Sequence, residues 1–282
     1  MIYFCADDYG VSKESNKRIE RSLEFGVLNK ISVLPNGELT DFNKLLLNKN
    51  VNLALHLNLV EGYPLSKSNE VSLLISKDGS FKYSFLGLFL LSISFKKKEL
   101  EKQLYKEIKN QIYFWKTCVE GKRPILIDSH QHTHMIPLVF KNLLKFIKDE
   151  GIDIEYLRIP AEPILPYIIT PQFYKISNII KHWLLNFLNL INRKEFKKVN
   201  INTAYFIGVM YSGCVTQEKI KKILPSYLKL ANKKGKDIEI ALHPGYLKND
   251  ETMIKGIKKN FKKFYLSPNR EKEFNTLKNI KL

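Results

Sequence analysis

Short apolar segments alternate with amphipathic segments through the first half of this 282-residue chain. The apolar segments have the length of buried strands, and the segments between them have the apolar spacing of helices. Such alternation is typical of βα units arranged around a parallel sheet, so we expect an α/β fold. Strands are predicted at residues 2–6, 31–34 and 51–59, and helices at 12–25, which ends at a C-terminal glycine, Gly26, and at 40–47.

The same alternation returns in the second half of the chain, after a long interruption. Residues 61–94 are too long for an ordinary connection and are typical of a functional or mobile loop, so we expect a lid at 61–95. Residues 164–200 mix helical patterns with prolines and basic residues, and we interpret them as an insertion. No linker divides the chain, which predicts one domain over 1–282. Further strands are predicted at 124–128, 156–159, 204–209 and 238–242, and helices at 98–118, 138–150 and 216–231.

The net charge of the chain is strongly positive. Lys and Arg outnumber Asp and Glu by 46 to 28, a formal charge of +18 that would attract anionic partners. The excess is mostly lysine scattered over helical faces, and no helix-turn-helix, RNA-recognition or zinc-finger pattern accompanies it, so we expect no nucleic acid partner. Three widely spaced cysteines argue against a disulfide framework and favour a reducing, cytoplasmic setting.

Membrane insertion and export are not expected. The apolar start of the chain meets Asp7 and Asp8 at once, so it lacks the apolar core of a secretory signal. No uninterrupted apolar run approaches the roughly 18 to 20 residues that span a bilayer. The oligomeric state is not determined by the sequence, which is compatible with a homodimer.

Polar residues stand at the carboxyl ends of four predicted strands. They are Asp7 and Asp8, His56, the run DSHQHTH at 128–134, and His243, and these clusters hold five of the six histidines. Parallel α/β folds build their active sites at this edge of the sheet. One carboxylate and two imidazoles would bind a divalent ion such as zinc and leave a position for water or substrate.

Chemistry suggests roles for these residues without assigning all of them. Neighbouring Asp7 and Asp8 should project to different sides of a strand, so one could bind metal while the other acts as a base. For a metal-bound water attacking a carbonyl, a carboxylate would accept the proton and a second acid would protonate the leaving group, for which His243 is the candidate. A solvated turn for the aspartates and a core position for His56 are the structural alternatives.

The DSHQHTH run is the most specific local signal. Its three histidines would share one face if the segment were extended. At least one of His132 and His134 is expected to support the metal ligands rather than touch the ion, and a non-catalytic metal-binding tract is the competing interpretation. Arg158, at the end of another predicted strand, would bind substrate or form an ion pair with an active-site aspartate.

Taken in order, these motifs resemble those of the YdjC-like carbohydrate deacetylases, which include the chitooligosaccharide deacetylases. The motifs are ADDYG at 6–10, LHLNLVEG at 55–62, DSHQHTH at 128–134, RIP at 158–160 and HPGY at 243–246. The resemblance implies a deformed (β/α) barrel related to the polysaccharide deacetylases, and metal-dependent removal of an acetyl group from an N-acetylated sugar. It also implies Asp8, His56 and His130 as metal ligands, Asp7 as general base and His243 as general acid.

The chain departs from this family at two places. Cys5 stands where many members have Asn, and residues 164–200 match no pattern of the family. The sugar therefore remains open, as does the choice of zinc, magnesium, manganese or cobalt.

Two other functional classes fit the sequence less well. An amidohydrolase would carry a His-x-His pair on its first strand, which is absent here, and a non-enzymatic metal-binding or anion-binding protein would not explain polar clusters at so many strand ends. We also hypothesise that the positive charge and the apolar segments 85–95 and 164–191 dock the enzyme at an anionic membrane to reach a lipid-linked N-acetylated sugar. The alternative is that these segments are a lid and a buried helix.

Overall fold

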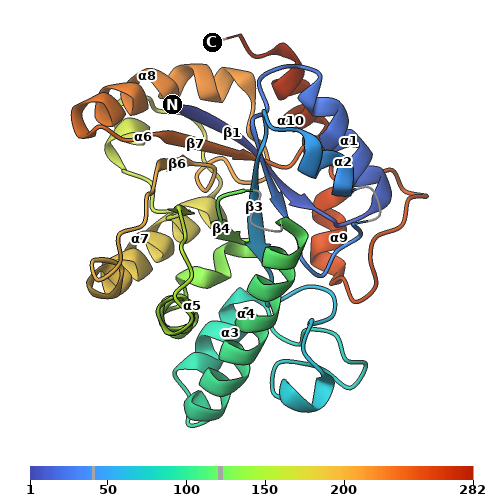
Figure 1. Cartoon of the computed structure of the whole chain (residues 1–282). Helices are drawn as coiled ribbons and strands as arrows, with labels where there is room; N and C mark the ends of the chain where they lie inside the picture. Colours follow the sequence, from blue (N-terminus) through green and yellow to red (C-terminus); the bar gives the residue numbers. More distant parts are fainter. Residues whose placement is uncertain (40–41, 120–122, 282) are drawn as a thin grey trace.

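Seven parallel strands form one curled sheet in the computed structural model, which describes residues 1–39, 42–119 and 123–281 (Figure 1). The sheet order is β5-β4-β3-β2-β1-β7-β6, and every neighbouring pair is parallel. This arrangement confirms the expected barrel-like α/β fold. The strands are β1 (Ile2–Tyr9), β2 (Lys30–Val33), β3 (Asn52–Leu57), β4 (Leu126–Ser129), β5 (Tyr156–Leu157), β6 (Tyr205–Ile207) and β7 (Ile238–Leu242).

The two edges of the sheet meet at a single bridge. Tyr156 of β5 pairs with Asn202, which lies shortly before β6. The backbone N–H of Leu157 donates to the carbonyl of Asn202 at 3.1 Å, and the N–H of Asn202 donates to the carbonyl of Glu155 at 3.2 Å. The barrel is therefore closed at this seam by two hydrogen bonds instead of a full ladder.

Helices cover the outside of the sheet (Figure 1). The longest, α4, packs against α5 and β3 and buries Leu100, Leu104, Ile108, Ile112 and Trp115, the stripe expected from its sequence. The helices are α1 (Lys13–Leu23), α2 (Phe42–Leu47), α3 (Phe85–Ser92), α4 (Lys97–Val119), α5 (Pro137–Asp149), α6 (Leu165–Ile169), α7 (Ile176–Phe196), α8 (Gln217–Lys234), α9 (Lys259–Tyr265) and α10 (Pro268–Asn279), with short 3₁₀ helices η1 (Ser68–Glu70) and η2 (His130–Met135).

The predicted elements agree well with these. All seven predicted strands are present, although β1 continues to Tyr9 and β5 has only two residues. The helix predicted at 40–47 is described from Phe42, because positions 40 and 41 lie outside the described residues. The segment expected as a lid holds η1 and α3, and the segment interpreted as an insertion forms α6 and α7. Helices α9 and α10 were not predicted.

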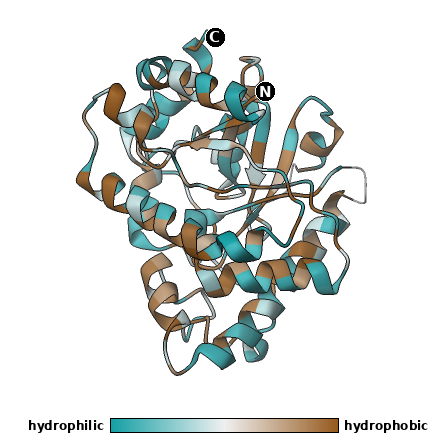
Figure 2. Ribbon diagram, turned by 90° about the vertical axis from the view of Figure 1, so that its left-hand side faces the viewer, coloured by the Kyte–Doolittle hydropathy of each residue, from teal (hydrophilic) through white to brown (hydrophobic). Residues whose placement is uncertain are grey.

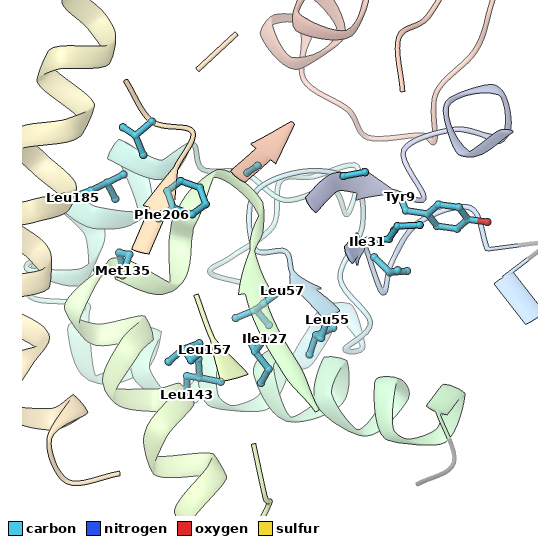
Figure 3. Packing of buried hydrophobic residues seen from close by; sticks show 14 of the residues in the cluster. Tyr9, Ile31, Leu55, Leu57, Ile127, Met135, Leu143, Leu157, Leu185 and Phe206 are labelled. Atoms are coloured by element: carbon cyan, nitrogen blue, oxygen red, sulfur yellow. The ribbon is translucent and has the colours of Figure 1, made fainter. Parts of the chain in front are cut away.

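Side chains of the strands alternate between an apolar outer face and a polar inner face. Leu55 of β3 and Ile127 of β4 belong to the main apolar core, shown in Figure 3. Their neighbours His56 and Asp128 point the other way, into the barrel, where both are buried. The period of two residues thus packs the helices on the outside and gathers ionisable groups inside.

None of the helices within the described ranges is long and apolar enough to cross a bilayer.

Candidate metal centre and active site

The carboxyl end of β1 contains a bulge that aims Asp8 into the barrel. The register with β2 shifts between Ala6 and Tyr9, and Asp8 has a φ of +68°. Aspartate tolerates this left-handed conformation better than most residues, and bulges near active sites commonly redirect one side chain. As a result Asp7 and Asp8 both border one cavity, although they contact different partners.

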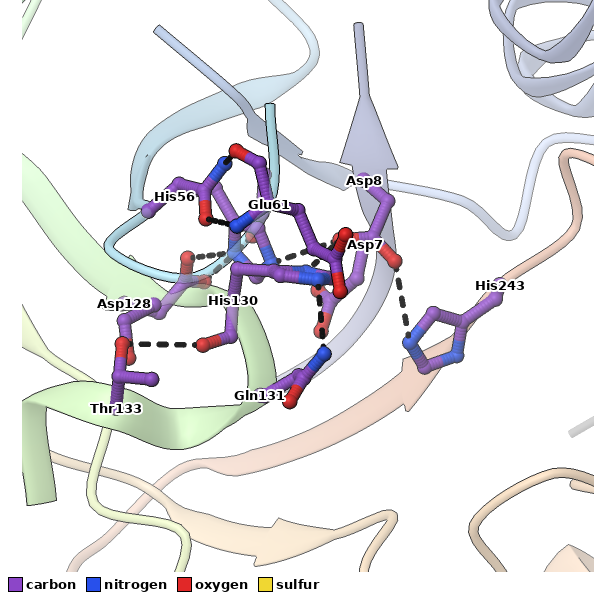
Figure 4. A network of polar contacts seen from close by, with 12 residues as sticks. Asp7, Asp8, His56, Glu61, Asp128, His130, Gln131, Thr133 and His243 are labelled. Atoms are coloured by element: carbon purple, nitrogen blue, oxygen red, sulfur yellow. Dashed lines mark hydrogen bonds and ion pairs between the residues drawn. The ribbon is translucent and has the colours of Figure 1, made fainter. Parts of the chain in front are cut away.

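Asp8, His56 and His130 lie together at the inner end of this cavity (Figure 4). Nε2 of His56 is 3.0 Å from Oδ1 of Asp8, and Nδ1 of His130 is 2.6 Å from the same oxygen. One ligand atom from each residue falls within 4.8 Å of the others, and all three side chains are buried. This donor set of one carboxylate and two imidazoles fits a divalent cation. It would fill only part of the coordination sphere of the cation.

A second carboxylate orients His56 from behind. Nδ1 of His56 is 2.6 Å from Oδ1 of Asp128, which leaves Nε2 facing Asp8. Asp128 in turn accepts from Ser32 Oγ at 2.5 Å and pairs with Arg158 at 2.9 Å. Burial lowers the pKa of His56, but Asp128 and Asp8 outweigh burial and raise that pKa to about 10. The centre therefore attracts positive charge.

The second oxygen of Asp8 is held by Tyr265 of α9. The Tyr265 hydroxyl donates to Oδ2 of Asp8 at 2.7 Å. This contact leaves Oδ1 for the two imidazoles. Tyr265 was missed by sequence reasoning because no motif marks the helix that carries it.

Arg158 lies beneath Asp7, fully buried. Its guanidinium donates to both oxygens of Asp7 at 2.7 and 2.8 Å and to Glu239 at 2.7 Å. Burial raises the pKa of the Asp7 carboxyl, but Arg158 more than offsets this and holds that pKa well below its usual range. Of the two roles considered for Arg158, this geometry favours the ion pair with an active-site aspartate over contact with substrate.

Cys5, Asp7 and Asp128 form a second group whose potential ligand atoms lie close together. Arg158 already supplies the positive charge that a metal ion would bring to this group, because the guanidinium pairs with both carboxylates and donates to Sγ of Cys5 at 3.2 Å. We therefore assign no metal to this group.

His243 lies across Asp8 from His56 and His130 (Figure 4). It is the most open of the predicted site residues, with 22% of its side chain exposed. Its Nε2 is 3.7 Å from Oδ2 of Asp8, and its Nδ1 is 3.7 Å from Oε2 of Glu273. Glu273, on α10, also accepts the backbone N–H of His243 at 2.6 Å and binds Arg270 through both oxygens. Glu273 is a second residue that the sequence did not reveal.

The histidine run does not share one face, which corrects the expectation for an extended segment. Gln131 and His132 have φ values of +52° and +57° inside η2, so the chain turns sharply after His130. His134 points away from the cavity and contacts the carbonyl of Arg158 at 2.8 Å. His132 borders the cavity, and its Nδ1 is buried without a hydrogen-bond partner.

The cavity above the centre has a volume of about 470 Å³, which is within the range of small-molecule sites. Its floor is formed by the strand-end residues. Its walls include Phe85 and Leu86 at the start of α3, and Lys181 and Leu184 of α7. The two segments predicted as a lid and an insertion thus both contribute to the rim of the same cavity.

Comparison with protein families agrees with this geometry. The family described as YdjC-like protein matches residues 1–282. The chain belongs to the YdjC-like family. This confirms the resemblance indicated by the sequence motifs.

Curated relatives of this YdjC-like protein are hydrolytic enzymes, in line with the predicted enzymatic role. A carbohydrate deacetylase of Clostridium beijerinckii is 29% identical over 194 residues, which are 65% of this chain and 73% of the relative. A carbohydrate deacetylase of Danio rerio is 31% identical over 164 residues, or 57% of this chain and half of the relative.

Among solved structures, one described as a proposed cellobiose-phosphate cleavage protein from Enterococcus faecalis V583 has a similar fold. The TM-score is 0.68 with 18% sequence identity, over 99% of this chain and 90% of that one. The similarity supports the architecture of the YdjC-like protein.

Proposed function

We propose that this YdjC-like enzyme hydrolyses the acetamido group of an N-acetylated sugar and releases acetate. The observation that carries the proposal is that Asp7 and His243 border the same cavity as the buried Asp8, His56 and His130 group. The names of the curated relatives support carbohydrate deacetylation.

A divalent cation would be held by Asp8, His56 and His130. Bound there, it would acidify water and polarise the acetamido carbonyl. Asp128 and Tyr265 would keep the ligand atoms of His56 and Asp8 turned toward it, as their present hydrogen bonds do. Zinc and magnesium are both candidates, and metal analysis of the purified protein decides between them.

Asp7 would accept the proton of the attacking water. Its carboxylate borders the cavity, and the Arg158 ion pair keeps it ionised, which is the state that a general base requires. The same ion pair fixes the direction of the carboxylate, so Arg158 acts as a positioning residue.

His243 would deliver a proton to the nitrogen of the leaving amine. Its partly open side chain lies across Asp8 from the two other histidines, and Glu273 fixes the backbone of His243 and faces Nδ1. A carboxylate at Nδ1 stabilises the protonated imidazole and leaves Nε2 free to face substrate.

Residues of the cavity wall would select the sugar. His132 presents a buried ring without a partner at Nδ1, which suits a hydrogen bond to a hydroxyl or amide group of the sugar. Phe85 and Leu86 supply apolar surface from the segment at 61–95, which supports our proposal that this segment is a lid.

An acetate-release screen tests the function directly. The protein would be loaded with zinc, magnesium, manganese or cobalt and offered N-acetylated mono-, oligo- and lipid-linked sugars, with metal-depleted protein as the control. We expect release that requires a metal. Absence of release from every sugar with every metal would overturn the proposal.

A further inference from the structure

Helix α7 buries three polar residues beside Leu185 and Leu188, and it turns most of its other apolar residues outward, unlike an ordinary surface helix. On its buried side, Asn178 donates to the carbonyl of Ser212 at 2.9 Å, and Asn192 donates to the carbonyl of Met135 at 2.9 Å. On its outer side, the spacing of three and four residues is occupied by exposed apolar side chains. They are Ile176, Ile180, Trp183, Phe187, Leu190 and Ile191, with Trp183 62% exposed.

Two neighbouring segments extend this surface, which we call the apolar face. Exposed apolar residues of α3 and its C-terminal end are Leu86, Leu90, Ile93 and Phe95, and those of α6 and the loop after it are Leu165, Ile168, Ile169 and Phe173. Leu86 of α3 and Leu184 of α7 border the same cavity, so α3 and α7 bring part of the apolar face to the entrance of the site. Figure 2 shows the side of the molecule on which α6 and α7 lie in Figure 1, and several helices there have hydrophobic turns.

The charges within these segments have one sign. Residues 79–98 contain four lysines and no Asp or Glu, and residues 163–194 contain three lysines, one arginine and no Asp or Glu. The cations include Lys96 and Lys97, which directly follow the exposed Phe95, and Lys181, which borders the cavity. Aromatic and aliphatic side chains combined with Lys and Arg are characteristic of helices that lie in the interface of an anionic bilayer.

We propose that the apolar face docks on an anionic lipid surface and that the cavity entrance thereby opens toward an N-acetylated sugar carried by a lipid. The substrate class rests on the proposed deacetylase function, whereas the docking does not. A second copy of the chain is a poorer occupant for two reasons. A two-fold interface here would bring the same lysines together, and it would cover the cavity entrance.

Binding is tested with intact protein and two kinds of vesicle, phosphatidylcholine alone and phosphatidylcholine mixed with phosphatidylglycerol. We expect co-sedimentation with the mixed vesicles that weakens as salt is raised, because anionic lipid attracts the basic residues. The chain has two tryptophans, and Trp115 is fully buried, so Trp183 acts as a reporter. Its fluorescence should shift to the blue on docking. No binding to the mixed vesicles, or binding without a shift, would overturn the proposal.

A triple variant locates the surface. Phe95→Ser, Phe173→Ser and Phe187→Ser together retain Trp183 and remove exposed rings, so the fold should be kept. We expect partition into mixed vesicles to fall by about tenfold or more. The matched control is Leu47→Ser with Leu228→Ser, two exposed leucines outside the apolar face, and it should bind like the parent. Equal binding by the parent and the triple variant would contradict the proposal.

Two further measurements separate the remaining outcomes. Sedimentation velocity without lipid should show the same mass for parent and triple variant, and a parent dimer that the triple variant loses would assign the face to a second copy instead. Acetate release should be equal for parent and variant on a soluble sugar and lower for the variant on a vesicle-borne sugar. Docking without any acetate release would leave this inference standing and count only against the proposed function.

Discussion

The carboxylate of Glu273 holds His243 at two points, accepting its backbone N–H at 2.6 Å and lying 3.7 Å from its Nδ1. The two residues are 30 positions apart, on α10 and at the end of β7. Glu273 is itself fixed by the two hydrogen bonds from Arg270 and by the N–H of Val215 at 2.8 Å. The C-terminal helix thus takes part in the site although none of its own residues stands at a strand end.

Replacing Glu273 by Gln should lower kcat for acetate release by roughly ten- to a hundredfold with little change in KM, because a supporting hydrogen bond is altered while the cavity is not. Glu271→Gln, an exposed carboxylate on the same helix, is the control. An unchanged kcat would reduce Glu273 to a structural role.

Asp7→Asn should reduce acetate release by roughly 10²- to 10⁴-fold, the range for loss of a general base. The bound metal should be retained, because Asp8, His56 and His130 are unchanged. Metal content and turnover are measured on the same preparation, with Asp153→Asn, an exposed aspartate, as the control. A variant that keeps its turnover would exclude Asp7 as the base, and one that loses its metal would make Asp7 part of the metal site.

Asp128→Asn should weaken metal binding by roughly ten- to a hundredfold, because Asp128 fixes the ring of His56 at 2.6 Å. Ser32→Ala removes only the hydroxyl that donates to Asp128, so its effect should be smaller. Competition with a chelator of known affinity measures both variants. Equal weakening of metal binding by Ser32→Ala and Asp128→Asn would show that Asp128 does not act by orienting His56.

Acid should destabilise the fold through His134. Burial lowers the pKa of this imidazole from 6.5 to about 4, so its contribution is complete above pH 6.5 and is lost as pH falls toward 4. At 1.36 kcal/mol per pKa unit, the loss is about 3 kcal/mol in the free energy of unfolding. Urea denaturation between pH 7 and pH 4 should show a flatter pH dependence for His134→Asn than for the parent. Parallel curves for the two proteins would refute this.

Glu162 should act in the opposite direction over almost the same pH range. Burial raises its pKa from 4.5 to about 7, even though Gly208, Val209 and Met210 donate backbone N–H groups to it. Its favourable contribution is complete below pH 4.5 and is lost as pH rises through 7. Glu162→Gln should therefore make the loss of stability on acidification steeper than in the parent, in the same urea titration. An unchanged pH dependence would show that Glu162 ionises in the folded protein as it does in the unfolded chain.

Strand positions could be predicted because parallel strands are buried on both faces and read as short apolar runs. The polar clusters could be predicted equally well, since Asp8, His56 and His130 each follow or end such a run. The turn after His130 could not be predicted, because Gln131 and His132 adopt left-handed conformations without the glycine that usually signals them.

Residues that act through another residue were harder to find. Tyr265 and Glu273 lie in a lysine-rich C-terminal region whose helical pattern is weak, and only the packed structure brings them to Asp8 and His243. Helix α7 was obscure for a related reason. Most of its apolar residues face outward, and its buried side mixes Leu185 and Leu188 with polar residues, so the apolar pattern did not indicate which side of the helix is buried.

The seam of the barrel separates the strands that place the candidate metal ligands from the segment that forms part of the cavity wall. Tyr156 and Asn202 meet through one bridge, and the chain between them forms α6 and α7 instead of further strands. The pairings that hold β1, β3 and β4, which carry the candidate metal ligands or lead into them, involve no residue between 163 and 200. The segment that supplies α7 to the wall of the cavity is therefore not part of the strand pairing that places the candidate ligands.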